Sequence, residues 1–235
     1  MNQGRIDVSS TESRIIHTLN TPIQNLNGIA FESFSGTYSV PNVNASKDSF
    51  LFKSGNRPWK LVKVQNGCYE LKELSRLFAS MTGSRLHPNY ATGRIWFTLP
   101  KGNFLDFKVN NSFAKVLGAE QKIIGSDTEN LTYECPHKSN IVPFNRIFIH
   151  CSLVKGSLVG GKQSNVVYAF KPKGVRPGEP IVEEKIFPFF CESNRRDSIW
   201  EFEIRITDEN MELLDFRGEI IDVTLLLRFD GPTDD

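Results

Sequence analysis

The sequence has no apolar run long enough to span a bilayer, and its amino terminus, MNQGRIDVSS, has no apolar signal core. These two absences argue against a membrane-spanning protein and against export through a signal peptide. We therefore expect a protein that is assembled inside the cell and is not secreted by that route.

Cysteine is scarce and widely spaced, which argues against a disulfide-rich scaffold and a zinc finger. The four cysteines contain no CxxC pair and lie at Cys68, Cys135, Cys151 and Cys191. We expect them to be reduced and mostly buried. Cys135-Pro136-His137 does not have the spacing of zinc ligands. His150 and Cys151 are neighbours on an expected strand, so their side chains should point to opposite faces. No metal-ligating residues are predicted.

An excess of charge of either sign is also missing. Lysine and arginine total 28, aspartate and glutamate total 27, and the net charge is +1. Proteins that bind nucleic acid usually carry a positive excess or a recognisable module. Basic residues do gather in one region, but they fall on expected loops and strand ends and are interpreted as solvated: Lys155, Lys162, Lys171, Lys173 and Arg176. No specific nucleic acid is predicted as a partner.

The sequence motifs that usually carry catalysis are absent as well. GSLVGGKQ, from Gly156 to Gln163, differs from a phosphate-binding loop because glutamine replaces the magnesium-binding hydroxyl and a β-rich segment follows it. We interpret it as a glycine-rich hairpin. Adjacent carboxylates such as Glu183 and Glu184 are expected at a solvated strand end. No catalytic and no cofactor-binding residues are predicted, and the protein is not expected to be an enzyme. Loss of an activity on substitution of Cys151 would contradict this interpretation.

The strongest pattern that is present is an alternation of apolar and polar residues near the carboxyl terminus. In IWEFEIRIT, from residue 199 to 207, Phe202, Ile204 and Ile206 share one face of the expected strand. A second strand follows a polar turn, with these residues on one face: Val223, Leu225, Leu227 and Phe229. Both patterns predict long, half-buried antiparallel strands that close a sheet. The aliphatic second strand is expected in the middle of a sheet.

Only one stretch has the periodicity of a helix of ordinary length. Leucine, phenylalanine and methionine recur at helical spacing in ELKELSRLFASMTG, and Gly83 is placed to end the helix. A shorter helix is expected in NSFAKVLG, ending at Gly118. The rest reads as short strands separated by Gly, Pro and Asn. This pattern predicts an all-β antiparallel sandwich with one or two short helices. Many of the 18 phenylalanines are expected in its interior.

We expect a single folded domain from residue 31 to 230. Residues 1–30 are rich in Asn, Ser, Thr and Gln with sparse apolar residues, which is typical of a flexible arm ordered only by a partner. Removing such an arm should leave the folded domain stable and weaken assembly. Residues 231–235 are expected to form a short acidic tail.

The order of these elements resembles that of a known viral family. Five segments are similar, in the same order, to parts of the small capsid proteins of Polinton (Maverick)-type viruses and their adintovirus relatives: VQNGCYELKELSRLFASMTG, VNNSFAKVLGAE, NRIFIHCSLV, GEPIVEEKIFPFF and FEIRITDENMELLDFRGEIIDVTLLLRF. The family often has Asn-Gly in its last turn. This chain has Asn210-Met211 there, so that turn is expected to differ. The likeness extends over about residues 58–229.

The resemblance implies a single jelly roll of the penton type that forms homopentamers at the vertices of an icosahedral capsid. It further implies a double-jelly-roll major capsid protein as partner, a location in the virion and assembly inside the host cell. It supplies no catalytic or contact residues. An alternative is a receptor- or glycan-binding β-sandwich head, expected to be trimeric. Exposed aromatics in one loop cluster would favour that alternative. The aromatics to examine are Trp59, Tyr90, Trp96 and Trp200, and we expect all three tryptophans in the core.

Overall fold

The structure is a computed structural model of the 235-residue chain, and it describes residues 2–159, 161–194 and 198–230. The chain divides into two compact units. Unit 1 combines Met1–Ser39 with Phe144–Asp235, and unit 2 is Val40–Pro143. This division differs from the single domain expected from residue 31 to 230. Unit 2 is inserted into the sequence of unit 1, and an insertion of this kind leaves no compositional boundary in the sequence.

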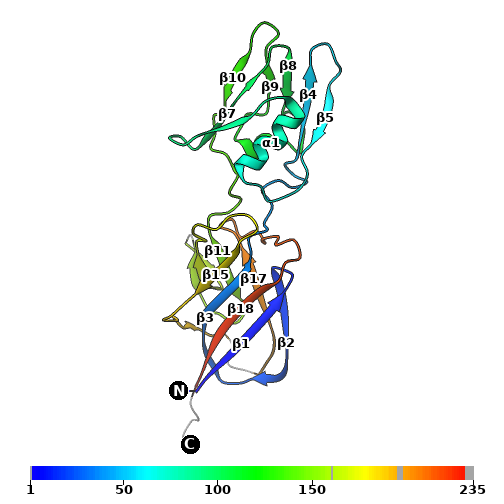
Figure 1. Ribbon diagram of the computed structural model, residues 1–235. Helices are drawn as coiled ribbons and strands as arrows, with labels where there is room; N and C mark the ends of the chain where they lie inside the picture. Colours follow the sequence, from blue (N-terminus) through cyan, green and yellow to red (C-terminus); the bar gives the residue numbers. More distant parts are fainter. Residues whose placement is uncertain (1, 160, 195–197, 231–235) are drawn as a thin grey trace, which may run out of the picture. The chain divides into compact units, whose positions relative to one another are not determined.

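Unit 1 is built from two antiparallel sheets, whose strands are labelled in Figure 1. The first sheet contains, in spatial order, β1 (Asn2–Ser10), β18 (Ile221–Phe229), β3 (Leu26–Thr37) and β15 (Pro180–Glu184). The short strand β16 (Cys191–Glu192) also pairs with β3. The second sheet contains, in spatial order, β14 (Val166–Phe170), β11 (Ile147–Cys151), β17 (Ile199–Thr207) and β2 (Arg14–Ile23).

The strand order of these two sheets is that of a jelly roll. Along the chain, β1, β3, β15 and β18 enter the first sheet, and β2, β11, β14 and β17 enter the second. Among these eight strands the chain crosses from one sheet to the other after every strand but β11, which is followed by β14 in the same sheet. This confirms the predicted all-β antiparallel sandwich with a single jelly roll.

The connections and contacts of unit 1 show which strands share an edge. The hydroxyl of Tyr168 in β14 donates a hydrogen bond of 2.8 Å to the carboxylate of Glu183 in β15, so these two strands lie at one edge. Only residues 11–13 connect β1 to β2, so β1 and β2 lie together at the other edge. It follows that β15 and β2, the outermost strands of their respective sheets, lie at opposite edges of unit 1.

The alternation in β17 and β18 places apolar side chains in the core, as predicted. The buried residues on these two strands include Phe202, Ile204, Ile206, Val223, Leu225 and Leu227. β18 lies between β1 and β3, which confirms its expected central position. The two strands belong to different sheets, however, so the prediction that they close one sheet together is wrong. An alternating pattern predicts which face of a strand is buried, but it does not predict which strand lies next to it.

The amino-terminal residues form strands and not the expected flexible arm. β1 pairs with β18 along its whole length, from Asn2↔Phe229 to Ser10↔Ile221. β2 pairs with β17. Val8 of β1 and Ile15 of β2 are buried. Edge strands are held by backbone hydrogen bonds and a few inward side chains, so their polar composition looks like that of a disordered segment. The acidic tail expected at residues 231–235 lies outside the described residues.

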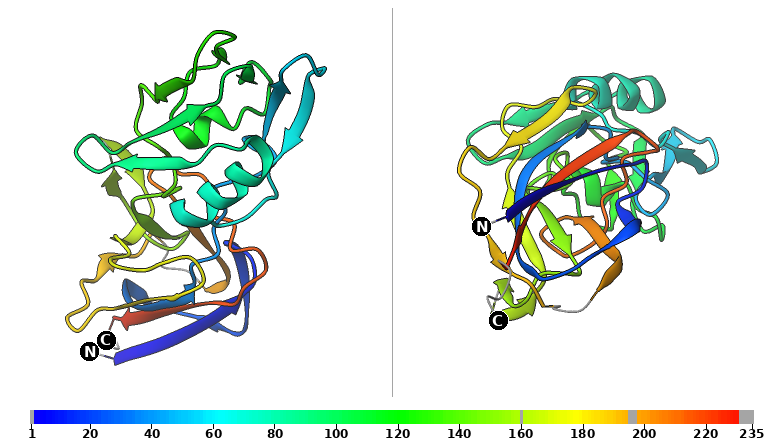
Figure 2. Two further views of the ribbon diagram at one scale, coloured as in Figure 1. Left: turned by 45° about the horizontal axis from the view of Figure 1, so that its top comes forward. Right: turned by 90° about the horizontal axis from the view of Figure 1, so that it is seen from below.

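Unit 2 contains two smaller antiparallel sheets and both helices (Figures 1 and 2). One sheet is formed, in spatial order, by β5 (Lys60–Lys63), β4 (Ser49–Ser54), β8 (Asn103–Asp106) and β9 (Ile123–Gly125). The other is formed by β10 (Leu131–Glu134), β7 (Arg94–Leu99) and β6 (Leu86–Asn89). The helices are α1 (Leu71–Thr82) and α2 (Ala114–Leu117). In the part of the chain that the structure describes, no helix has the length and apolarity needed to cross a membrane.

The sequence predicts α1 closely. A capping box between Glu70 and Glu73 starts the helix, and Gly83 ends it with a left-handed φ of 76°. Phe78 of α1 is fully buried and packs against three further rings, those of Phe50, Phe97 and Phe113, at centroid distances of 5.6–6.5 Å. α2 also ends at the expected glycine, Gly118, but is only 4 residues long.

The glycine-rich segment of unit 1 is a hairpin, as predicted. β12 (Ser157–Val159) pairs with β13 (Lys162–Ser164) in an antiparallel register. No helix follows the turn, because the chain continues directly into β14. The segment therefore lacks the helix amino terminus that a phosphate-binding loop requires.

Candidate functional site

The buried cysteines are poor nucleophiles in this structure. The four cysteines form no disulfide with one another. Cys135 and Cys151 are buried, and burial raises the pKa of each thiol to about 12. At that pKa the nucleophilic thiolate is almost absent near neutral pH. Cys68 and Cys191 are half-buried. Among the described residues, no group of three or more His, Cys, Asp or Glu side chains is arranged to hold a metal ion.

The side chain of His150 lies on the opposite side of β11 from that of Cys151, and its ring contacts two polar side chains. Its Nδ1 lies 3.1 Å from Oδ1 of Asn165, and its Nε2 lies 2.9 Å from the hydroxyl of Thr207. Burial lowers the pKa of His150, and the positive charge of Arg205 lowers it further. The side chains of Asn165 and Thr207 therefore hold the ring of His150 from both of its nitrogens.

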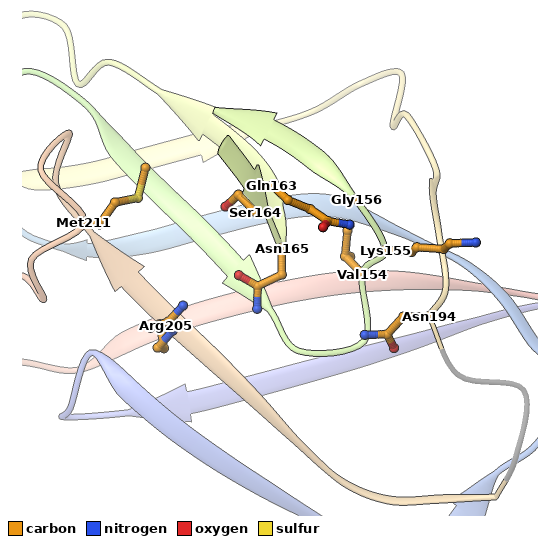
Figure 3. A pocket seen from close by; sticks show the side chains of 9 residues that line it. All are labelled: Val154, Lys155, Gly156, Gln163, Ser164, Asn165, Asn194, Arg205 and Met211. Carbon is orange, nitrogen blue, oxygen red and sulfur yellow. The ribbon is translucent and has the colours of Figure 1, made fainter. Parts of the chain in front are cut away.

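Beside this histidine, unit 1 has a hollow with a volume of about 570 Å³, shown in Figure 3. Its walls come from the segment after β11, the hairpin β12–β13, the segment after β16, and β17. The polar and charged residues of the lining include Lys155, Gln163, Asn165, Asn194 and Arg205, and Met211 adds an apolar side chain. This hollow is called the polar pocket below.

The side chains of the polar pocket lie in distinct directions. Arg205 and Asn165 point toward each other, whereas Lys155 extends outward from the pocket (Figure 3). Asn194 is held in place because its Nδ2 donates a hydrogen bond of 2.8 Å to the backbone oxygen of Ser152. No acidic side chain is among the described residues that line the pocket.

A second feature of unit 1 is an apolar loop, residues 185–190, that joins β15 to β16. Ile186 and Phe187 are each 84% exposed, and Phe189 is 80% exposed. Val182, on the adjoining edge strand β15, is 60% exposed. Large apolar side chains in one contiguous exposed stretch are uncommon on monomeric proteins and are typical of an interaction surface. The sequence analysis expected phenylalanine mainly in the interior, and these two phenylalanines do not follow that expectation.

A third feature, called the edge hollow, is lined from β2, the edge strand on the other side of unit 1, and from its neighbour β17. Ile16 of β2 is 58% exposed and Trp200 of β17 is 56% exposed, and both line a hollow of about 460 Å³. An ion pair of 2.6 Å between Arg14 and Glu203 borders it. The edge hollow therefore combines two exposed apolar side chains with polar and charged neighbours.

The four aromatics named from the sequence do not gather in one cluster. Tyr90 is 92% exposed and Trp59 is 39% exposed. Trp96 is half-buried and stacks on His87 with a centroid distance of 4.3 Å. These three belong to unit 2, whereas the exposed Trp200 belongs to unit 1. The prediction that all three tryptophans lie in the core is wrong.

The polar pocket and the edge hollow are each lined by segments far apart in the sequence, whereas the apolar loop is the single stretch of residues 185–190. None of the segments that line the polar pocket contains a motif that marks a binding site. One signal was available for the apolar loop: the run KIFPFF lacks the strict alternation of a half-buried strand and contains a proline.

Comparison with known proteins gives little beyond the general arrangement of the chain. No protein-family model and no curated protein matches it. Among solved structures it is similar to the mavirus penton protein, known from a crystal of the selenomethionine-labelled protein, at 10% sequence identity and a TM-score of 0.49. The similarity covers 97% of this chain and 100% of that chain. Similarity at this level assigns the chain to no family.

Proposed function

We propose that this chain is a structural capsid protein of the penton type, which associates with further copies of itself into a closed ring. Two features of unit 1 support the proposal: the jelly-roll strand order and a pair of apolar surfaces at opposite edges. The second feature carries it, because it explains why a protein would leave two phenylalanines and a tryptophan exposed to water. The buried, protonated thiols fit a structural role better than a catalytic one.

The arrangement of the two apolar surfaces favours a head-to-tail contact. The apolar loop adjoins β15, and the edge hollow adjoins β2, at the opposite edge of the sandwich. One surface is a projecting loop and the other is a hollow, so neither is suited to contact a second copy of itself. A contact between different patches on two identical chains repeats from copy to copy and closes into a ring when the rotation allows it.

The size of the two surfaces is compatible with the centre of a stable interface. An exposed phenylalanine can bury about 150–250 Å² on contact, and a specific interface buries about 800 Å² on each partner. The exposed residues of the apolar loop would supply the apolar centre. At the margin, Lys185 next to the loop and Glu201 next to the hollow carry opposite charges. Charges of opposite sign at a rim orient the partners as they meet.

The remaining parts of the proposal come from the sequence resemblance. It suggests five copies per ring, a place at the vertices of an icosahedral capsid and a double-jelly-roll major capsid protein as neighbour. It also suggests a virion of the Polinton or adintovirus kind. The described surfaces do not depend on the number five, since a head-to-tail contact can close a ring of any small number.

Mass measurement of the full chain in solution tests the ring. The wild-type protein should show a discrete mass of several copies by light scattering, with five as the proposed number. The double variant Phe187→Ser/Phe189→Ser should be monomeric. Tyr90→Ser is the matched control, because it removes an exposed aromatic of unit 2. A wild-type chain that stays monomeric at every concentration would sink the proposal, and a stable trimer would favour the receptor- or glycan-binding head.

A mixing experiment tests whether the contact is head-to-tail. Trp200→Glu should remove the hollow and keep the loop, while the Phe187→Ser/Phe189→Ser variant keeps the hollow and lacks the loop. Each variant alone should be monomeric, and an equimolar mixture should give dimers and no larger species. If the mixture stays monomeric, the loop and the hollow are not partners.

A further inference from the structure

We propose that the polar pocket binds an acidic saccharide, whose carboxylate lies against the guanidinium of Arg205. The inference concerns a site that the assembly proposal does not use, and it does not depend on ring formation. Its volume of about 570 Å³ lies within the range of small-molecule sites.

The charge of the pocket favours an anion. Lys155 and Arg205 are the charged residues of its described lining. Arg205 is half-buried, and in the described part of the chain no hydrogen bond or ion pair engages its guanidinium. A guanidinium removed in part from water, with its donors unused, is well matched to a carboxylate, which it can bind through two parallel hydrogen bonds. The neighbouring Arg14 differs from Arg205, because its charge is already neutralised by an ion pair with Glu203.

Asn165 adds a fixed polar group on the side of the pocket toward Arg205 (Figure 3). Its side chain is held in place by the contact of Oδ1 with Nδ1 of the buried His150 at 3.1 Å. A polar group held in place before the ligand arrives costs less ordering on binding.

The acceptors in the pocket distinguish a saccharide from a simple anion. Asn194 uses its nitrogen in the hydrogen bond to Ser152, which leaves its oxygen as an acceptor. Gln163 also carries an acceptor oxygen. Acceptors repel phosphate, sulfate or an isolated carboxylate, but they can receive the hydroxyl hydrogens of a sugar. Met211, which is 41% exposed, offers apolar surface for the carbon-bound hydrogens of the ring.

Titration of the full chain with a matched pair of sugars tests the proposal. Methyl glucuronide carries the carboxylate, and methyl glucoside has the same ring without it. Saturation-transfer NMR and calorimetry should show saturable binding of methyl glucuronide and at least a tenfold weaker response to methyl glucoside. Binding of the acid should weaken as the salt concentration rises, because part of the attraction is electrostatic.

Two variants locate the binding in the polar pocket. Arg205→Gln should weaken the binding of methyl glucuronide at least tenfold. Lys155→Glu changes an exposed side chain, leaves the fold intact and should weaken binding severalfold through charge repulsion alone. Arg57→Gln is the control, because it removes the same charge from an exposed position in unit 2.

Each outcome decides for or against the inference. Binding of the acid that is weakened in both pocket variants, most strongly in Arg205→Gln, and unchanged in the control supports it. Equal binding of both sugars, or no saturable binding of either, overturns it. Inorganic sulfate that displaces methyl glucuronide at equal concentration would make the pocket a plain anion site. A glutamate-rich peptide that binds more tightly than methyl glucuronide would make it a peptide site.

Discussion

The ring of Tyr168 stacks on the ring of Phe31, with centroids 4.4 Å apart and planes inclined by 10°. Phe31 belongs to β3 in the first sheet and Tyr168 to β14 in the second, so this contact joins the two layers of the jelly roll. The hydroxyl of Tyr168 also donates to Glu183. Burial, together with this hydrogen bond, raises the pKa of Tyr168 to about 12, so the phenol stays protonated and keeps donating.

The first prediction concerns this stacked pair. Phe31→Ala removes a ring that is 2% exposed and should lower the free energy of unfolding of unit 1 by about 3–5 kcal/mol. Tyr168→Phe keeps the ring and removes only the hydrogen bond, so it should cost about 0.5–1.5 kcal/mol. Urea unfolding of both variants measures the difference. Equal losses would show that the hydroxyl, and not the stacking, dominates this contact.

The second prediction concerns the amino-terminal strand. Deleting residues 2–10 removes the partner of β18 on one side and exposes a nine-residue aliphatic strand edge. We expect a melting temperature lower by at least several degrees and a greater tendency to aggregate. Arg5→Ala is the control, since its exposed ion pair with Asp7 should contribute little to stability. An unchanged melting temperature after the deletion would support the original expectation of a flexible amino-terminal arm.

The third prediction concerns pH. The folded-state pKa of His150 is lowered, so the unfolded chain binds its proton more readily than the folded chain does. The stability linked to His150 is fully present above the unfolded pKa of about 6.5 and is lost as the pH falls toward the lower folded-state pKa. Denaturant unfolding between pH 7.5 and about pH 5 should show this decline. His150→Gln should flatten it, and substitution of the exposed His137 should leave it in place. A decline of equal slope in His150→Gln would assign it to other groups.

The fourth prediction compares two glycines that end the two helices of unit 2. Gly83 and Gly118 have nearly the same left-handed φ, 76° and 75°. A Cβ on Gly83 would meet nothing within 4 Å, whereas on Gly118 it would lie 2.4 Å from the backbone oxygen of His137. Gly83→Ala should therefore cost about 1–2 kcal/mol, the price of the left-handed conformation alone. Gly118→Ala should cost about 1–3 kcal/mol more, because the backbone must shift. Thermal unfolding measures both, and equal losses would place the cost in φ only.

The elements predicted well from the sequence are those whose signal is local. α1 has its own periodicity, its capping glutamates and its terminal glycine, so residues 70–83 contain all the information needed. The hairpin at residues 157–164 and the inward face of β17 are local in the same sense. What failed is non-local: β1 and β2 are strands because β18 and β17 lie beside them, and their own residues barely indicate it.

The candidate surfaces could not be predicted from the sequence, for a related reason. Apolar residues predict burial on average, and many of the phenylalanines were expected inside, so composition alone did not distinguish Phe187 and Phe189. Their 84% and 80% exposure makes them the most informative residues of the apolar loop. The polar pocket depends on Arg205 being left without a carboxylate while Arg14, its cross-strand neighbour in β2, has one. No pattern within either segment predicts that one arginine has a carboxylate partner and the other does not.

The pairing of β1 with β18 has a consequence for how the chain is made. During synthesis β1 leaves the ribosome before every other described strand, and its partner β18 leaves it after all of them. The strand pairs of unit 2 lie close together in the sequence, so that unit can fold while translation continues. The jelly roll cannot close until β18 emerges, and through that interval β1 is an unpaired strand. A translation pause before residue 221 should therefore leave an incomplete chain to which chaperones remain bound.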